Sequence, residues 1–157
     1  VRAGWIEACP EIIRHLEKRG YLNSQGSAIP FVGDVIEELM SSKELDSSLD
    51  DLCGSLQQRA DALCNTCAKN DLQVFTPATG GYFMIVKVPE ACKLEGDDKG
   101  AAFASLLKTK HNVSVLAGSR CGPAGADYIR VCFAYTAADE IKEGVERIAA
   151  AAKSLMP

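Results

Sequence analysis

The first half of the chain has the hydrophobic spacing of helices. The clearest pattern begins after residue 48, where apolar residues recur at intervals of three and four. The recurring residues are Leu49, Leu52, Cys53, Leu56, Ala60, Leu63, Cys64 and Cys67. Any one of Asp46, Ser47 and Ser48 can cap the start of such a helix. The pattern predicts one long helix with a single apolar side, which is typical of a helix that packs along a protein or bridges two lobes.

Two shorter helices are predicted before the long one. The first follows Pro10, a residue that the first turn of a helix tolerates, and ends near Gly20. The second covers residues 29–40 and is apolar over much of its surface, so we expect it to be well buried. Residues 1–8 are predicted to form a short extended segment ahead of both helices.

From residue 72 onward the pattern changes to strands, turns and shorter helices. Strands are predicted at 72–75, 82–88, 113–116 and 128–135. A helix capped by Asp97 or Asp98 runs to about Asn112, and a last helix is capped by Thr136 with Asp139 in the capping-box position. The order is therefore β-β-α-β-β-α, which predicts a compact α/β layer with a small mixed sheet.

The last predicted strand, YIRVCFAY at residues 128–135, carries an arginine in a segment that otherwise favours burial. With a period of two, one face holds Ile129, Val131, Phe133 and Tyr135, and we expect this face to join the core. The other face holds Tyr128, Arg130, Cys132 and Ala134. This second face is small and shallow around one guanidinium, like the floor of a cleft.

A guanidinium in that position needs a partner, because an unpaired buried charge is costly and arginine does not lose its proton. Its planar fork matches a carboxylate or a phosphate. Two interpretations of Arg130 are open at this point. In the first, the arginine forms an internal ion pair with an acidic residue or emerges at a sheet edge. In the second, it binds an anionic ligand.

Composition and charge exclude several classes of protein. The 157 residues are 47% hydrophobic and carry 17 basic and 21 acidic side chains, a net charge of -4, which argues against nucleic-acid binding. The chain contains neither a membrane-spanning apolar stretch nor the pattern of a secretion signal. Seven cysteines at irregular spacing favour reduced thiols, and hence the cytoplasm or an organelle matrix. Because the sequence opens on Val1 without a Met, we expect a piece of a longer protein.

The remaining motifs carry little chemistry of their own. Cys64 and Cys67 form a CxxC motif late in the long helix and are interpreted as core cysteines, because no second pair stands at zinc spacing. His15 and His111 are isolated and are expected at the surface. Gly80 and Gly81 are either plain turn residues or a place where the backbone approaches a ligand.

Three segments in this order resemble the C-terminal part of the fold type I pyridoxal-phosphate-dependent aminotransferases, the class I/II group. VRAGWIEACPEII, at residues 1–13, resembles the Arg-x-Gly-Trp strand that follows the Schiff-base lysine in that family. TPATGGYFMIVKVP, at residues 76–89, resembles the family's Pro-x-Gly-Gly-Tyr-Phe strand. YIRVCFAYTAADEIKEGVERIAAA, at residues 128–151, resembles its Ile-Arg-x-x-Phe strand and terminal helix. The resemblance covers essentially the whole chain.

The resemblance implies specific roles for four residues. Arg130 corresponds to the arginine that binds the substrate α-carboxylate, and Arg2 to the arginine that contacts the cofactor phosphate. Tyr82 and Phe83 are expected near the substrate pocket. Residues 117–121 depart from the family's Pro-Gly-x-x-Phe stretch, and none of the lysines has the sequence context of the Schiff-base lysine.

The resemblance also implies a domain plan and a function. Residues 1–45 correspond to a remnant of the large domain, 46–70 to the interdomain helix, and 71–157 to the small C-terminal α/β domain. The parent protein is expected to be a homodimeric transaminase of amino acid metabolism that uses pyridoxal phosphate, an amino acid and a 2-oxo acid, while this part alone is expected to be inactive. Two alternatives are a stand-alone domain that binds a small carboxylate without catalysis, and a structural interaction domain with Arg130 in an internal salt bridge.

Overall fold

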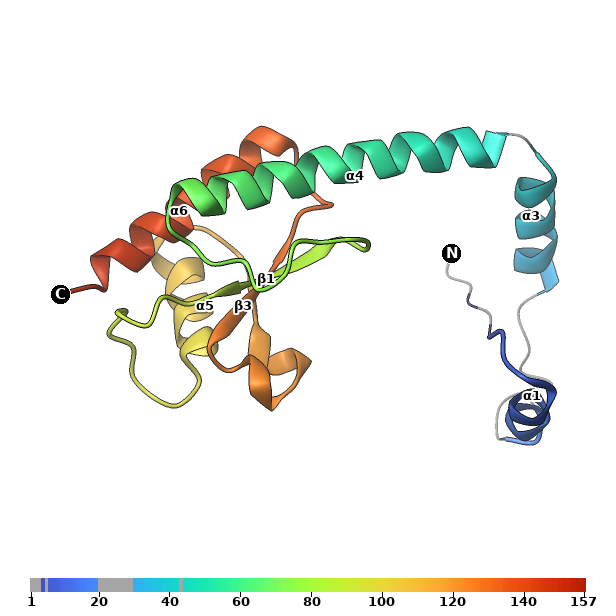
Figure 1. Cartoon of the computed structure of the whole chain (residues 1–157), viewed down its shortest axis with the longest axis horizontal. Helices are drawn as coiled ribbons and strands as arrows, with labels where there is room; N and C mark the ends of the chain where they lie inside the picture. Colours follow the sequence, from blue (N-terminus) through green and yellow to red (C-terminus); the bar gives the residue numbers. More distant parts are fainter. Residues whose placement is uncertain (1–3, 5, 20–29, 43) are drawn as a thin grey trace. The chain divides into compact units, whose positions relative to one another are not determined.

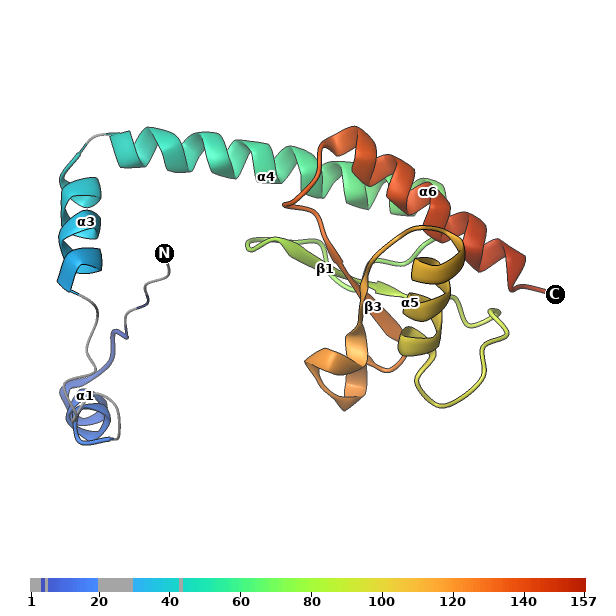
Figure 2. The ribbon, with the colours of Figure 1, turned by 180° about the vertical axis from the view of Figure 1, so that it is seen from behind.

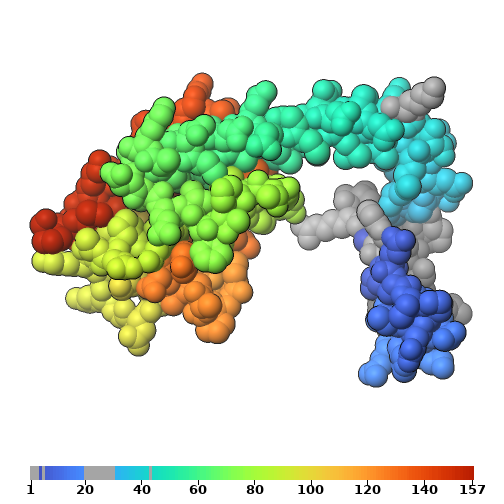
Figure 3. All heavy atoms as spheres, in the orientation of Figure 1, coloured from blue at the N-terminus to red at the C-terminus, as the bar shows by residue number. Residues whose placement is uncertain are grey.

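Helices account for most of the first seventy residues of the computed structural model, which describes residues 4, 6–19, 30–42 and 44–157 (Figure 1). The chain divides into two compact units, Val1–Asp51 and Leu52–Pro157. The second unit contains the sheet and the core, and its atoms pack into a continuous body in the space-filling view (Figure 3).

The first unit contains the two short helices that the sequence predicts. Helix α1 spans Pro10–Glu17 and helix α3 spans Pro30–Ser41. Their apolar side chains are not buried within the described residues: Phe31 is 70% exposed and Met40 is 71% exposed. The expected burial of the 29–40 helix is therefore wrong for the described part of the chain, since no described side chain covers these two residues. Within the predicted extended segment at residues 1–8, the described positions form no strand.

Helix α4 spans Glu44–Lys69 and confirms the long helix predicted from the periodic pattern. Only the C-terminal part of its apolar stripe is buried, at Ala60, Leu63, Thr66 and Cys67, whereas Leu49 and Leu52 are about half exposed. The helix ends where Asp71 adopts a positive φ of 57° and the amide of Leu72 donates to the carbonyl of Cys67. This left-handed turn redirects the chain toward the sheet.

The sheet has three described strands in the order β1-β3-β2, namely Phe83–Lys87, Tyr128–Cys132 and Leu116–Ala117. Both pairings are antiparallel, so the expectation of a mixed sheet is wrong. The 72–75 strand is reduced to a single bridge between Val74 and Val86, because the turn at Asp71 and the proline at position 77 leave little extended chain between them. Of the predicted 113–116 strand only Leu116 is extended within the sheet, in β2, which continues to Ala117.

Helices α5 and α6 complete the second unit. Helix α5 spans Lys99–Lys110, and the side chain of Asp98 caps it by accepting from the amide of Ala101 at 2.8 Å. Helix α6 spans Ala138–Ser154. Its cap is not the predicted one: the carboxylate of Glu140, rather than Asp139, accepts from the amide of Ala137 at 3.1 Å, so the helix starts one residue later than a Thr136 cap requires.

The core lies between one face of the sheet and the helices α4, α5 and α6 (Figures 1 and 2). The fully buried large side chains are Phe103, Phe133, Leu63, Leu107, Ile129, Val86, Val88, Val145 and Cys67. Ile129 and Phe133 confirm the predicted core face of the last strand, and Val131 packs against the same core. Tyr135 does not, because β3 ends at Cys132 and the tyrosine beyond it is 91% exposed. The other face of the sheet carries Arg130.

Candidate functional site

The candidate site is the face of the sheet that points away from the core, which we term the open sheet face. Its register follows from the strand pairing: Ile85 and Leu116 stand opposite Arg130 on the two neighbouring strands, and Phe83 stands opposite Cys132. Paired residues of antiparallel strands share one face, so these side chains surround the guanidinium. The open sheet face consists of Phe83, Ile85, Lys87, Leu116, Tyr128, Arg130 and Cys132.

Arg130 has no acidic partner within the residues that the structure describes. The three ion pairs found there are Lys87 with Glu90, Lys142 with Asp139, and Arg147 with Glu143. The guanidinium carbon of Arg130 lies 4.2 Å from the centre of the Phe83 ring, and its Nη1 lies 3.8 Å from Sγ of Cys121. An internal salt bridge, one of the two interpretations of this arginine, is not observed in this part of the chain.

Aromatic side chains form two pairs in this region, one of which includes the ring of Phe83 that contacts the guanidinium. The rings of Tyr82 and Phe83 are 4.8 Å apart at 65°, and those of Phe75 and Tyr128 are 5.7 Å apart at 84°. Tyr82 is 52% exposed and Phe83 is 41% exposed, so neither ring belongs to the core. The structure thus brings together three of the four residues that the sequence singled out: Phe83 contacts Arg130 directly, and Tyr82 contacts Phe83.

Cys121 is a neighbour of Arg130 that the sequence does not reveal. It ends the short helix η1, Gly118–Cys121, and the second short helix η2, Pro123–Gly125, follows at once. Gly118 and Gly125 in this loop allow the two short helices to touch. The contact between Cys121 and Arg130 depends on this tertiary arrangement and has no signature in the local sequence.

The described residues do not form a site for pyridoxal phosphate. Arg2, the predicted phosphate contact, lies outside the described residues and stays a prediction. The one described lysine on the open sheet face is Lys87, whose pKa is raised by its hydrogen bond with Glu90. Its amine pairs with the carboxylate of Glu90 at 2.6 Å, and the residue lacks the sequence context of the Schiff-base lysine.

Of the two cysteines of the CxxC motif, Cys67 is a core residue as predicted, whereas Cys64 is partly buried and packs against the core. Cys67 is 1% exposed, and burial raises the pKa of its thiol to about 11. Burial, followed by the charge of Asp61, also raises the pKa of Cys64. Neither thiol is prepared for redox or metal chemistry. In the described part of the chain, no group of three or more His, Cys, Asp or Glu side chains could hold a metal ion.

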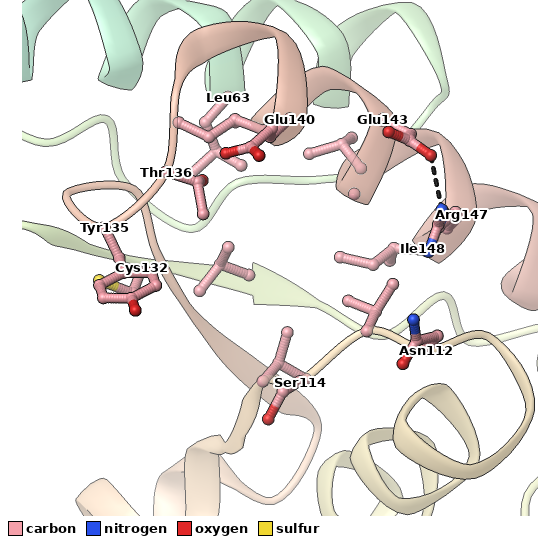
Figure 4. Close-up of a pocket in the computed structure, with 16 residues that line it drawn as sticks. Leu63, Asn112, Ser114, Cys132, Tyr135, Thr136, Glu140, Glu143, Arg147 and Ile148 are labelled. Atoms are coloured by element: carbon pink, nitrogen blue, oxygen red, sulfur yellow. Dashed lines mark hydrogen bonds and ion pairs between the residues drawn. The ribbon is translucent and has the colours of Figure 1, made fainter.

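A separate cavity of about 610 Å³ lies beside the N-terminal half of α6 and does not include Arg130 (Figure 4). Residues 112–115 and the end of β3 form its other walls. Figure 4 shows the ion pair of Glu143 and Arg147 on one side of this cavity, with Cys132 and Tyr135 on the other. Most of the exposed lining is apolar, and it carries no unpaired cation comparable with Arg130 among the described residues.

Comparison with known proteins identifies the family. The family model for aminotransferase class I and II matches residues 1–148 of the chain. The chain therefore belongs to the class I and II aminotransferase family, and the fold type I resemblance drawn from its motifs is confirmed. No curated protein matches the chain in sequence.

Solved structures of aminotransferases share the fold. The aromatic aminotransferase of Pyrococcus horikoshii OT3 matches with a TM-score of 0.65 at 19% identity, over 74% of this chain and 29% of its own. A Methanococcus jannaschii protein, described as similar in its active site to kynurenine aminotransferases, matches with a TM-score of 0.59 at 25% identity, over 71% and 28%. A PLP-bound protein of Clostridium difficile 630, described as an aminotransferase, matches with a TM-score of 0.57 at 23% identity, over 68% and 26%.

The matched region is less than a third of each of these three proteins. No helix in the described ranges is both long and apolar enough to cross a membrane.

Proposed function

We propose that this chain is the part of a pyridoxal-phosphate-dependent aminotransferase that binds the substrate carboxylate. The parent enzyme transfers an amino group between an amino acid and a 2-oxo acid, acts as a homodimer, and works in the cytoplasm or an organelle matrix. The observation that carries the proposal is Arg130, a guanidinium on an open sheet face with no acidic partner in the described part of a chain of this family.

The surroundings of Arg130 leave its donors available for a carboxylate. The side chains of Ile85 and Leu116, its cross-strand neighbours, accept no hydrogen bonds, and the thiol of Cys121 is a weak acceptor. The planar fork can therefore form two parallel N–H···O bonds with one carboxylate. Such a pair fixes the orientation of an amino acid as well as its position, which is what a reaction at the neighbouring Cα requires.

The apolar groups around the fork add to this role. Phe83, Ile85 and Leu116 border the guanidinium with carbon rather than with competing polar groups. Closing such a surface over a ligand excludes water and strengthens the ion pair. Binding, orientation and exclusion of water are thus the contributions of this chain. The described residues do not provide the imine-forming lysine, so we expect the 157-residue chain alone to be inactive.

One alternative function uses the same arginine. A domain that binds a small carboxylate without catalysis needs Arg130 and its apolar surroundings but no imine-forming lysine. The described residues contain Arg130 and its apolar surroundings, and the one described lysine on the open sheet face is Lys87, which pairs with Glu90. Turnover by the full-length gene product distinguishes the two functions.

The test is therefore made on the full-length gene product. Each of the twenty common L-amino acids is supplied with pyruvate or 2-oxoglutarate as the acceptor, and the newly formed amino acid is measured. Carboxylate binding without any amino transfer would support the alternative. Where transfer occurs, Arg130→Lys should raise the apparent KM for the amino acid by roughly tenfold or more, since one of two charge-assisted bonds is lost.

The control for this substitution is Arg147→Lys. Arg147 lies on α6, pairs with Glu143 and is not part of the open sheet face. The control should leave KM as in the wild type, and the absorbance of bound cofactor should be the same in all three proteins. Unchanged kinetics in Arg130→Lys would remove Arg130 from the substrate site.

A further inference from the structure

We propose that Phe83 is a positioning residue for Arg130: its ring holds the guanidinium in place, and it affects carboxylate binding through the arginine rather than by touching the substrate. The inference rests on the proposed function of Arg130. It replaces the general expectation that Phe83 lies near the substrate pocket with a specific role.

The contact between the two residues follows from the register of the sheet. Arg130 pairs with Ile85, and Cys132 pairs with Phe83, so the arginine and the phenylalanine are diagonal neighbours on the same face of β1 and β3. Long side chains at such diagonal positions can meet. The guanidinium carbon lies 4.2 Å from the ring centre, well within the range in which the negative face of a ring attracts a cation.

Among the described residues, the guanidinium contacts the Phe83 ring and the thiol of Cys121. No carboxylate pairs with Arg130 among the described side chains, its cross-strand neighbours are aliphatic, and the thiol of Cys121 at 3.8 Å is a weak acceptor. An arginine side chain that no contact holds in place samples many rotamers. The entropy that it loses when a ligand orders it lowers the affinity for that ligand. A ring face restricts the guanidinium without using its N–H donors in conventional hydrogen bonds, so those donors stay available for a carboxylate.

The exposure of Phe83 supports a role outside the core. Phe83 is 41% exposed and is not part of the buried cluster, whereas its strand neighbour Met84 is 2% exposed. The ring of Tyr82 packs against it at 4.8 Å and 65°, which limits how the Phe83 ring can turn. The Tyr82 ring thus contacts the Phe83 ring edge-on, and the Phe83 ring in turn contacts the guanidinium of Arg130.

The first test measures the contact itself in the 157-residue chain. A guanidinium beside a ring face experiences the ring current, so the Nε proton of Arg130 should resonate upfield of the other arginine Nε protons in an NMR spectrum. Phe83→Leu should move this resonance to the ordinary range, whereas Phe83→Tyr should leave it upfield. A wild-type resonance in the ordinary range would overturn the proposal.

The second test is a double-mutant cycle in the full-length gene product, with the L-amino acid that the wild type transfers fastest as the substrate. The four proteins are the wild type, Phe83→Leu, Arg130→Gln and the double variant. Phe83→Leu should raise KM roughly three- to tenfold, which is the range expected for loss of a cation–π contact, and should change kcat by less than about twofold. Phe83→Tyr keeps a ring face and should restore the wild-type KM.

The cycle separates this inference from the proposed function. If Phe83 acts through Arg130, Phe83→Leu should have almost no effect in the Arg130→Gln background. An equal increase in KM in both backgrounds would mean that Phe83 contacts the substrate itself, and would overturn the inference while the proposed function stands. An unchanged KM in Phe83→Leu would overturn it as well. An unchanged KM in Arg130→Gln would instead overturn the proposed function.

Discussion

The backbones of Gly118 and Gly125 are in direct contact: a Cβ added to Gly118 would lie 2.5 Å from the carbonyl oxygen of Gly125. An added Cβ on Gly125 would likewise overlap the carbonyl group of Gly118. The contact joins η1 to η2 and so places Cys121, the last residue of η1, beside Arg130. The loop that borders the candidate site therefore requires glycine at both positions.

The first prediction concerns this contact. Gly125→Ala forces two backbone segments apart, and we expect it to lower the free energy of unfolding of the chain by about 1–3 kcal/mol, as overpacking typically does. Urea denaturation of the 157-residue chain measures the effect. The control is Gly144→Ala, because Gly144 lies within α6 with nothing within 4 Å of an added Cβ. That change should stabilise the chain by about 0.5–1 kcal/mol, since alanine favours a helix interior.

An unchanged stability in Gly125→Ala would show that the two short helices separate easily. In that case the loop would not fix the position of Cys121.

The second prediction concerns helix α4, whose two halves differ in burial. Leu63 is fully buried in the core and Leu52 is 53% exposed on the same helix. Leu63→Ala should lower the free energy of unfolding by about 2–5 kcal/mol, because it removes buried methyl groups and leaves a cavity. Leu52→Ala, the same change at an exposed position, should alter it by less than about 0.5 kcal/mol.

Denaturation of the 157-residue chain again supplies the measurement. Because both substitutions replace leucine with alanine in one helix, differences in helix propensity cancel between them. A large loss of stability in Leu52→Ala would contradict the exposed position of this residue and would mean that the N-terminal half of α4 is covered in solution.

The sequence predicts the long and strongly patterned elements well. Helix α4, strands β1 and β3, and helix α6 are all found close to where the hydrophobic spacing puts them, because each buries one continuous apolar stripe or face. The alternation in β3 also separates the core residue Ile129 from Arg130. The hydrophobic pattern alone is therefore enough to distinguish this arginine from the residues around it.

Other features depend on tertiary contacts and could not be read from local patterns. The direction of strand pairing is set by how β1 and β2 meet β3, and a mixed sheet and an antiparallel one have the same sequence periodicity. The N-cap of α6 is Ala137, whose amide donates to the carboxylate of Glu140. The local sequence favours Thr136, one residue earlier. The contact of Cys121 with Arg130 requires the glycine contact described above. The apolar residues of α3 predict that the helix is buried, but a local pattern does not identify the part of the protein that would bury it.

The third prediction concerns acid stability and the cap of helix α5. A hydrogen bond from the Ser119 side chain and, next, one from the amide of Ala101 lower the pKa of Asp98 below its ordinary value of 3.8. A carboxyl group whose pKa is lower in the folded state stabilises the fold fully above the unfolded pKa and loses that contribution as the pH falls through the folded pKa. The melting temperature of the wild-type chain should therefore fall with acidification between about pH 5 and about pH 2 in part because of Asp98.

Two asparagine variants isolate the contribution of this carboxylate. Asp98→Asn keeps a side chain that caps helices well but cannot titrate, so its melting temperature should fall less over the same pH range. Asp97→Asn removes the same charge one residue earlier without removing the capping carboxylate, and should lose stability in acid as the wild type does. Thermal melts recorded by circular dichroism at each pH make the comparison. If Asp98→Asn and the wild type lose stability equally, the hydrogen bonds from Ser119 and Ala101 do not stabilise the charged carboxylate in solution.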